Sequence, residues 1–304
     1  MKSSWIKYFL LTLAILSGGY YAILFANTRN NESRQINKKF ETLETSLDGR
    51  IGVYAINTAN NQSIQYRAVE RFPIQSTFKI MAISAILKQS ATNPHILKQK
   101  MTYTTQDLVY WSPITEKHVA EGMTISELCA ATMMYRDNTA TNLIIKKLGG
   151  PGAVNAYARS INDETFRIDS LEPNLNSDPM QLRDTSTPTA MENSLQKIIL
   201  GNVLPSFQQK QLITWMKGNT TGDARIRAGV PKGWIVADKT GASNEYGISN
   251  DIGIIWPPNC APIVVVIYSV HHTKDASRRD DILAAATRII IDGFTKTDSR
   301  LKEG

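Results

Sequence analysis

The sequence predicts an α/β fold of the α+β type, with one antiparallel sheet from both chain ends, flanking helices and a separate all-helical lobe. Strand-like segments open the chain and return near its end, whereas the interval from about 76 to 212 is mostly helical in pattern. Strands separated in this way pair into one sheet. We therefore expect an α/β lobe from 27–67 and 217–296, a helical lobe from 68–216, and an active site in the cleft between them.

The elements of this fold follow from local patterns. Alternating or β-branched runs predict the strands, and apolar residues at helical spacing predict the helices. The paired glycines Gly149 and Gly150 end one of these helices, as expected of a C-cap. The predicted strands are 49–56, 62–66, 234–239, 248–256 and 263–268, and the main predicted helices are 27–47, 76–87, 139–148, 208–216 and 276–294.

The N-terminus has the pattern of an export signal. Lys2 and Lys7 precede an apolar run from Tyr8 to Ala26, after which polar residues begin abruptly. Cleavage near Ala26 is favoured over a retained anchor, although the small-residue cleavage signal is imperfect and the run is nearly long enough to span a bilayer. We expect 1–26 to be a signal peptide or anchor, 27–304 to be the catalytic domain, and the protein to be periplasmic or secreted.

Composition excludes several classes of protein. The 304 residues are 42% hydrophobic and 20% charged, with a net charge of +7 spread along the chain rather than concentrated in a nucleic-acid surface. Cys129 lies in a helical pattern and is predicted to be a buried free thiol, with a disulfide to Cys260 as the alternative that an oxidising compartment would permit. The four histidines lack metal-ligand spacing, which predicts surface residues and a protein without metal or cofactor. We expect a monomer that contacts a membrane only through an uncleaved N-terminal segment.

Ser76 and Lys79 form the first candidate catalytic pair. Pro73 disfavours helix in the residue before it, so the following helix is expected to begin near Ser76. Residues three apart share a helix face, which places the Lys79 amine beside the Ser76 hydroxyl as nucleophile and base. A Ser-x-x-Lys pair also occurs by chance about once in a chain of this length, and a capping serine with a solvated lysine is the alternative.

Three further motifs change that balance. Tyr135 to Asn138 lies at a helix junction, Glu172 to Asn176 lies in a proline-bearing loop, and Lys239 to Gly241 ends a predicted strand. Taken singly, these motifs are a helix cap, a surface carboxylate and a strand end. In this order and spacing, the chain resembles the class A serine β-lactamases, which are described by Ser-x-x-Lys, Ser-Asp-Asn and Lys-Thr-Gly. The resemblance runs from about residue 40 to 295.

The resemblance implies hydrolysis of a β-lactam amide through an acyl-enzyme. Ser76 attacks the carbonyl, and Lys79 is one candidate acceptor of its proton. The backbone N–H groups of Ser76 and Ala242 form the oxyanion hole. Glu172 activates the water that hydrolyses the ester, and Asn176 helps to hold that water.

The resemblance also assigns the substrate contacts. Asn138 binds the side-chain amide of the substrate, and the Lys239-Thr240-Gly241 strand meets its carboxylate, where a cation and a hydroxyl suit an anion.

Two arginines match positions that family members use for that carboxylate. The Gly-Asn-Thr-Thr-Gly context favours Arg225 over Arg279. Trp111 occupies the position of the family's aromatic gate, with a packed surface aromatic as the alternative.

Arg136 is the largest departure from the family. It stands where the serine of Ser-Asp-Asn relays a proton to the departing lactam nitrogen. A guanidinium stays protonated and has no acceptor, so it cannot relay in the same way. We expect slower acylation unless a water substitutes, and the added cation either lowers the pKa of Lys79 or binds the substrate carboxylate.

The loop that carries Glu172 also departs from the family. Ser170 replaces an arginine that pairs with the aspartate at the far end of the loop, here Asp184, so we expect either a looser loop or closure by Arg167 or Arg183 instead. Two positions that hold a disulfide in several carbapenem-hydrolysing members are Gln75 and Ser243, so the sequence gives no support for carbapenem hydrolysis.

Two other functions use the same motifs. A peptidoglycan D,D-peptidase shares the serine, lysine and Lys-Thr-Gly chemistry, but normally lacks the loop base that Glu172 provides. A β-lactam-binding or sensing protein that acylates without turnover is the other alternative, because Arg136 replaces the relay serine.

Overall fold

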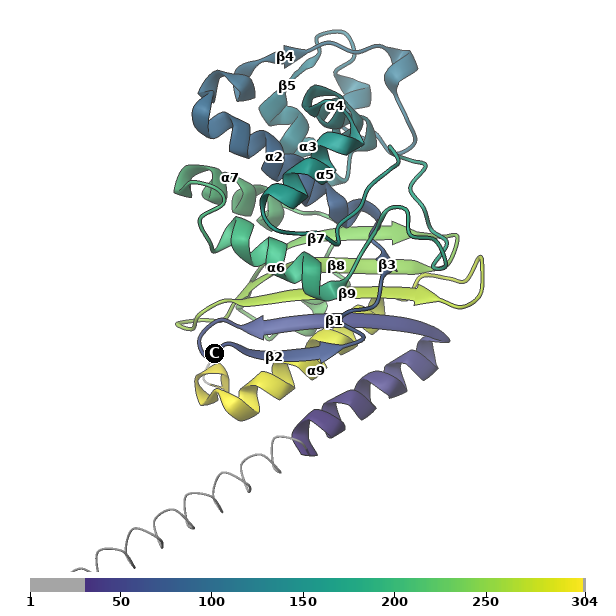
Figure 1. Ribbon diagram of the computed structural model, residues 1–304, viewed down its shortest axis with the longest axis vertical. Coiled ribbons are helices and arrows are strands. Elements are labelled where there is room, and N and C mark those ends of the chain that lie inside the picture. Colours follow the sequence, from purple (N-terminus) through teal and green to yellow (C-terminus); the bar gives the residue numbers. More distant parts are fainter. Residues whose placement is uncertain (1–30, 303–304) are drawn as a thin grey trace, which may run out of the picture.

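The two ends of the chain meet in one antiparallel sheet, as predicted. The computed structural model describes residues 31–302, and its five-stranded sheet has the order β2-β1-β9-β8-β7 (Figure 1). β1 pairs along its whole length with β9, from Gly49 opposite His271 to Asn57 opposite Ile263. The predicted α+β fold is confirmed. The strands are β1 (Gly49–Asn57), β2 (Gln62–Tyr66), β7 (Ile235–Ser243), β8 (Ile248–Trp256) and β9 (Ile263–His271).

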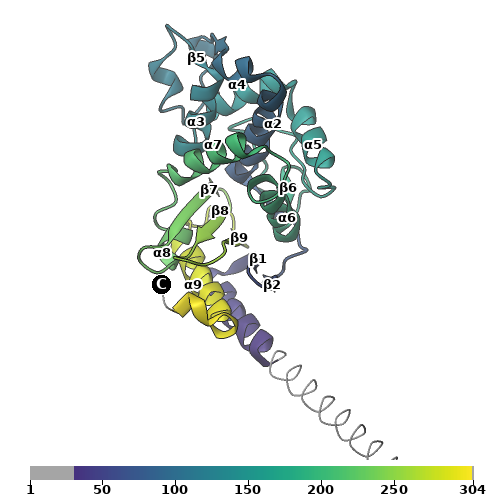
Figure 2. The same ribbon diagram turned by 90° about the vertical axis from the view of Figure 1, so that its left-hand side faces the viewer.

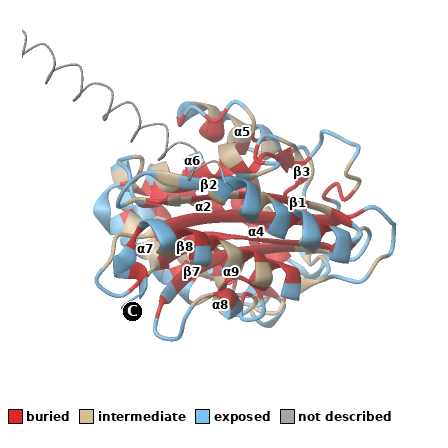
Figure 3. Cartoon of the chain, turned by 90° about the horizontal axis from the view of Figure 1, so that it is seen from below, coloured by how far each residue is buried: buried red, intermediate tan, exposed pale blue. Residues whose placement is uncertain are grey.

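The sheet has a hydrophobic core on each face because side chains alternate along a strand. In β9, Val264 and Val266 belong to the core shared with the helical region, whereas Val265 and Ile267 face the other core. That second core includes Phe40 from the helix that runs to residue 47, together with α9 (Asp280–Thr297). Figure 2 shows these two helices on one side of the sheet and the helices from α2 to α7 on the other. Figure 3 shows the strands buried between them.

The helical region surrounds α2 (Lys79–Thr92), which is almost wholly buried. A helix that is apolar on most of its surface requires neighbours on all sides, and α2 contacts α3, α4, α5 and α7. The helix α6 packs on β1 and β9. The bounds of the helices in this region are α3 (Ile125–Tyr135), α4 (Asn138–Leu148), α5 (Pro151–Ser160), α6 (Pro188–Ile199) and α7 (Ser206–Lys217).

Shorter elements connect the two parts of the fold. The short helix α8 (Ile226–Gly229) packs on α9. Two strand pairs lie outside the main sheet: β3 (Phe72–Pro73) with β6 (Thr185–Ser186), and β4 (Lys100–Met101) with β5 (Met123–Thr124). The 3-10 turns are η1 (Gln75–Phe78), η2 (Pro94–Lys98), η3 (Thr105–Asp107), η4 (Thr115–Lys117) and η5 (Ser299–Lys302).

Element boundaries differ from the prediction at functionally important places. β7 does not end at Lys239 but continues to Ser243, because pairing with β8 extends to the Ser243–Ile248 pair. The last helix begins at Asp280 rather than at residue 276, and acidic residues in its first turn suit the positive end of the helix dipole. The C-cap at Gly149 is confirmed, with φ of 106°.

Three remaining sequence predictions have different outcomes. The segment 1–26 lies outside the described residues, and among residues 31 to 302 none of the helices has the length and apolar character of a bilayer span. Cys129 is a buried free thiol, as predicted. The prediction that all four histidines lie on the surface is wrong for His271, which is buried at the end of β9, where burial lowers its pKa.

Candidate active site

Ser76 lies in the 3-10 turn η1, one turn before the helix that was expected to contain it. β3 ends at Pro73, and the chain then turns sharply through Gln75, whose φ of 47° is in the left-handed region. Such backbone geometry is uncommon for a residue other than glycine and is often found at functional sites. Lys79 is the first residue of α2, so the serine and the lysine remain on neighbouring turns.

Glu172 joins this pair from a distant loop. Its Oε1 accepts a hydrogen bond of 2.9 Å from Ser76 Oγ and lies 3.1 Å from Lys79 Nζ. All three side chains are buried, with Ser76 4%, Lys79 0% and Glu172 7% exposed. A hydroxyl that donates directly to a carboxylate is close to a base that can take its proton.

Lys79 is held by three acceptors. Its Nζ donates to Asn138 Oδ1 at 2.6 Å and to the backbone carbonyl of Arg136 at 3.0 Å, in addition to its ion pair with Glu172. Burial lowers the pKa of Lys79, the Arg136 charge lowers it further, and Glu172 opposes this change. A lowered pKa makes it easier for the Lys79 ammonium to give up a proton, and brings its acid and base forms closer to balance at neutral pH.

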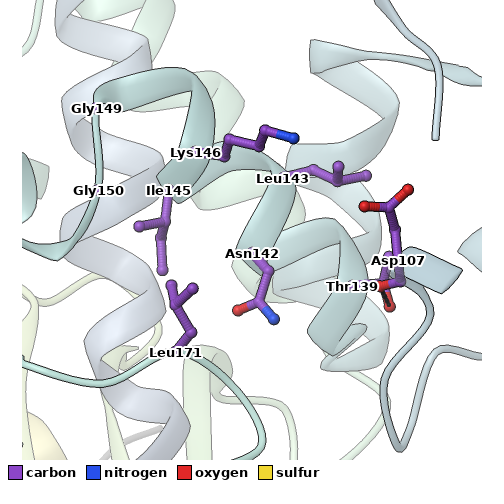
Figure 4. Close-up of a pocket in the computed structure, with 9 residues that line it drawn as sticks. All are labelled: Asp107, Thr139, Asn142, Leu143, Ile145, Lys146, Gly149, Gly150 and Leu171. Carbon is purple, nitrogen blue, oxygen red and sulfur yellow. Dashed lines mark hydrogen bonds between the residues drawn. The ribbon is translucent and has the colours of Figure 1, made fainter.

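Asn142 fixes the backbone of Glu172. Its Oδ1 accepts from the Glu172 N–H at 3.0 Å, and its Nδ2 donates to the Glu172 carbonyl at 2.9 Å. Sequence analysis missed this residue, although Asn142 lies one helical turn after Asn138 on α4 and thus shares its face. Asn142 also lines a pocket of about 430 Å³ together with Leu171, which belongs to the Glu172 loop. Figure 4 shows the Asn142 side chain between Thr139 and Leu171.

The loop around Glu172 is closed by Asp184 through backbone groups. One carboxylate oxygen of Asp184 accepts from the N–H groups of Asp169 and Ser170, and the other accepts from the N–H of Asn176. The expectation that Arg167 or Arg183 closes the loop is wrong. Three backbone donors take the place of the missing arginine at Asp184, because a carboxylate also accepts charge-assisted hydrogen bonds from backbone N–H groups. Arg167 pairs with Asp169, and Arg183 donates to Gln181.

The side chain of Asn176 points into its own loop. Its Nδ2 donates to the carbonyls of Asp178 and Arg183, and its Oδ1 accepts from the Asp178 N–H. The structure therefore gives Asn176 a part in shaping the loop, and its role in holding a water stays a prediction.

The edge strand β7 lies against η1. A Cβ built on Gly241 would lie 2.9 Å from the Ile74 carbonyl oxygen and 3.2 Å from the backbone nitrogen of Ser76. No side chain fits there, and this close approach brings Ala242 beside the serine. Because β7 is at the sheet edge, N–H groups along its outer side have no strand partner. The pair of N–H groups predicted to form the oxyanion hole, from Ser76 and Ala242, therefore lies at this junction.

A hydrogen-bonded bridge also connects the positions where some family members have a disulfide. Gln75 donates to Ser177 Oγ, and Ser177 donates to Ser243 Oγ at 2.8 Å. Gln75 also donates to the carbonyl of Asn176. The turn before Ser76, the loop of Glu172 and the end of β7 are thus joined without a covalent link.

Lys239 and Thr240 lie at the centre of β7. Lys239 is fully buried, and burial, followed by repulsion from Lys79 and Arg136, lowers its pKa well below the usual range. Thr240 Oγ1 is hydrogen-bonded to Thr221 Oγ1. A buried cation beside a hydroxyl is suited to an anionic group.

Asn138 and Trp111 are adjacent. The Asn138 N–H donates to the Trp111 carbonyl, and its side chain joins Lys79 to the Tyr110 carbonyl. Trp111 is 49% exposed and has φ of 63°, which presents its ring to solvent beside the site. Its predicted role as a gate is consistent with this exposure.

Arg225 and Arg279, the two candidates for the carboxylate, are both engaged elsewhere. Arg225 is 2% exposed, its Nη1 donates to the carbonyls of Gly241 and Asn250, and its Nε donates to Asp280. Arg279 forms a bidentate pair with Asp281 and reaches back to the Ser46 carbonyl, so it points away from Ser76.

Arg136 ends α3 in the left-handed conformation, with φ of 59°. Its side chain is half-buried, and burial together with the Arg225 charge lowers its pKa to about 10. The next residue, Asp137, is the N-cap of α4, which is the role that the sequence predicts for it when the motif is considered alone.

No three His, Cys, Asp or Glu side chains among residues 31–302 are grouped in a way that could hold a metal ion.

Comparison with known proteins identifies this arrangement. The sequence model of the β-lactamase enzyme family matches residues 34–294. The chain belongs to the β-lactamase enzyme family. The resemblance of this β-lactamase to the class A serine enzymes, which the motifs predicted, is confirmed.

Individual β-lactamases resemble this family member over almost its whole length. It is 50% identical to β-lactamase OXY-2 of Klebsiella oxytoca over 295 residues, which cover 97% of this chain and 100% of that protein. It is 51% identical to β-lactamase Toho-1 of Escherichia coli over 274 residues, covering 90% and 94%. The solved β-lactamase from Desulfarculus baarsii DSM 2075 superposes with a TM-score of 0.85 at 45% identity, covering 86% of this chain and 98% of that one.

Proposed function

We propose that this protein hydrolyses the β-lactam ring of penicillins or cephalosporins through an acyl-enzyme on Ser76, and so gives resistance to these antibiotics. The observation that carries the proposal is the contact of Ser76 Oγ with Glu172 Oε1 beside Lys79 Nζ. Relatives of about 50% identity are named β-lactamases. These names favour neither a D,D-peptidase nor a sensor.

Acylation begins at the Ser76 hydroxyl. Glu172 takes its proton, Oγ bonds to the lactam carbonyl carbon, and the N–H groups of Ser76 and Ala242 stabilise the oxyanion. The carbon–nitrogen bond then breaks, and the nitrogen takes a proton from the Lys79 ammonium, which recovers one from Glu172. The contacts of Lys79 and its lowered pKa support this route, and the proton balance closes without a relay at Arg136.

Deacylation uses the same carboxylate. Glu172 takes a proton from water, the water oxygen attacks the ester carbonyl, and the Ser76 oxygen leaves and recovers the proton. The two bonds from Asn142 to the Glu172 backbone support this role because they fix the base relative to the ester. Asn138 and Trp111 are proposed to contact the substrate side chain, and Lys239 with Thr240 its carboxylate.

The test is a kinetic assay with a chromogenic cephalosporin, followed by intact-protein mass spectrometry. The expected result is turnover by the wild-type protein and none by Ser76→Ala. Turnover by a folded Ser76→Ala variant would remove the proposed nucleophile. A persistent adduct on wild-type Ser76 without turnover would instead indicate a sensor or peptidase.

Export and assembly are further proposals. The apolar segment after Lys7 supports export through the inner membrane, with cleavage near Ala26, and a monomer is proposed for the mature domain. N-terminal sequencing of the protein recovered from a periplasmic extract tests the cleavage site, and light scattering tests the monomer. A start at Met1 or a dimeric mass would contradict these proposals.

A further inference from the structure

Three arginines that the sequence singles out are candidates for the substrate carboxylate, and the guanidinium groups of two of them already have partners. Arg225 is enclosed under β7 and β8 by two carbonyls and Asp280. Arg279 is paired with Asp281 outside the site. A guanidinium that already holds these partners must give some of them up before it can meet a new anion in the usual bidentate way. Arg136 is the third.

Arg136 is anchored inside the site by its backbone. Its carbonyl accepts from Lys79 Nζ at 3.0 Å, and its left-handed conformation ends α3 between Tyr135 and the α4 cap at Asp137. Its Nε is buried and has no hydrogen-bond partner among residues 31–302. Within the same residues, no hydrogen bond or ion pair joins its guanidinium to another side chain. An unpaired buried donor is costly, which indicates a partner that binds there.

The charges around Arg136 indicate that this partner is an anion. The Arg136 charge acts on Lys79 and on Lys239, and the charges of Arg225 and of the exposed Arg278 act on Arg136 in turn. The opposing carboxylates that act on it are Glu172, which is paired with Lys79, and Asp280, which is paired with Arg225. Positive charge therefore exceeds negative charge at this point.

We propose that Arg136 is a specificity-determining residue, whose guanidinium binds the substrate carboxylate together with Lys239. The position that relays a proton in related enzymes thus serves recognition of an anion in this one. The inference rests on the proposed β-lactam hydrolysis and concerns which side chain of this protein binds the substrate carboxylate. A guanidinium suits this task because it presents parallel N–H donors to both carboxylate oxygens.

The test compares a chromogenic cephalosporin with its methyl ester, which differs only in the carboxylate charge. The wild-type protein should prefer the acid in kcat/KM. Arg136→Gln and Arg136→Ser remove the charge and should reduce this preference by about 10- to 100-fold, mainly through a higher KM for the acid, as loss of a charge-assisted hydrogen bond requires. Arg136→Lys should retain part of it. Arg278→Gln, which removes an exposed charge nearby, is the matched control and should leave the preference unchanged.

Each outcome bears on a separate statement. If the wild-type protein hydrolyses the acid but folded Arg136→Gln or Arg136→Ser keeps the full preference, another group binds the carboxylate and the inference is overturned. An equal loss in Arg278→Gln overturns it as well, because the effect would then be a general one of positive charge. If the wild-type protein hydrolyses neither compound, the proposed function itself fails. Arg136→Ser carries the test should Arg136→Gln not fold, because serine is the residue that related enzymes have there.

Discussion

Ser76 Oγ donates a hydrogen bond of 2.9 Å to Oε1 of Glu172, although 96 residues separate them in the chain. The contact joins the turn that begins α2 to the loop that Asp184 closes. Lys79 lies against the same oxygen, so one carboxylate faces the nucleophile and its ammonium neighbour at once. The predictions below depend on this contact and on the groups that maintain it.

Replacing the base with its neutral isostere should trap the intermediate. In Glu172→Gln, deacylation should fall by about 10²–10⁴-fold, because the amide cannot take a proton from water. Acylation should slow less, since Lys79, which contacts the same Glu172 oxygen as Ser76 does, is the other candidate acceptor of the Ser76 proton. Intact-protein mass spectrometry at successive times should detect a lasting adduct on Ser76. Glu116→Gln, which changes an exposed glutamate, is the control, and rapid turnover by Glu172→Gln would exclude Glu172 as the base.

Restoring the relay serine at position 136 should speed acylation and weaken binding of the substrate carboxylate. Arg136→Ser should raise the acylation rate, because the new hydroxyl can deliver a proton to the lactam nitrogen. General acid assistance of this kind is worth about 10²–10⁴-fold. The same change should raise KM for substrates with a carboxylate. Stopped-flow measurement of the acylation phase checks the first effect. An unchanged or lower acylation rate would refute this account of the position.

A single methyl group on β7 should disrupt the site. In Gly241→Ala the new Cβ meets the Ile74 carbonyl at 2.9 Å, so β7 and η1 must move apart. Overpacking of this kind costs about 1–3 kcal/mol, and kcat/KM should fall because the Ala242 N–H moves with the strand. Gly152→Ala is the matched control, since no atom lies within 4 Å of its Cβ position. The melting temperature and kcat/KM should fall in the first variant only, because Gly152 lies in α5, where alanine is the better helix former.

Glu192 should make stability depend on pH. It is 1% exposed on α6, its Oε1 has no hydrogen-bond partner among residues 31–302, and burial raises its pKa from 4.5 to about 7. Between these values the unfolded state releases the proton while the folded state keeps it. Stability therefore falls as pH rises from about 4.5 to 7, by about 3 kcal/mol in total, and then levels off.

The neutral isostere tests this dependence. Glu192→Gln should be more stable than the wild type at pH 8 and should lose most of the decline between pH 5 and pH 8, as measured by urea unfolding. The exposed variant Glu116→Gln should follow the wild-type curve. A Glu192→Gln curve parallel to that of the wild type would show that Glu192 does not titrate in this range.

Local chemistry predicted much of the fold and the first half of the site. Apolar and β-branched runs located β8 and β9, and these runs are nearly continuous because both faces of the strands lie against apolar cores. The spacing of Ser76 and Lys79 placed them together because three residues make about one helical turn. The end of β7 was missed, since pairing with β8 extends the strand through Gly241 and a lone segment carries no sign of its partner.

Closure of the Glu172 loop shows where local reasoning fails. The missing arginine suggested another side-chain cation, but backbone N–H groups bind Asp184, and every residue other than proline has such a group. Arg225 was favoured from its context in the sequence, yet burial gives its guanidinium three partners that no motif reveals.

The sequence by itself determined the elements, the family and the residues able to do the chemistry, because helical and strand periodicity, motif spacing and the functional group of each side chain can be recognised in short segments. Only the tertiary structure decided that Ser76 donates directly to Glu172, what closes the loop and which partners hold the guanidinium groups of Arg225 and Arg279. Those outcomes depend on distances between atoms far apart in the chain, which packing of the two cores fixes.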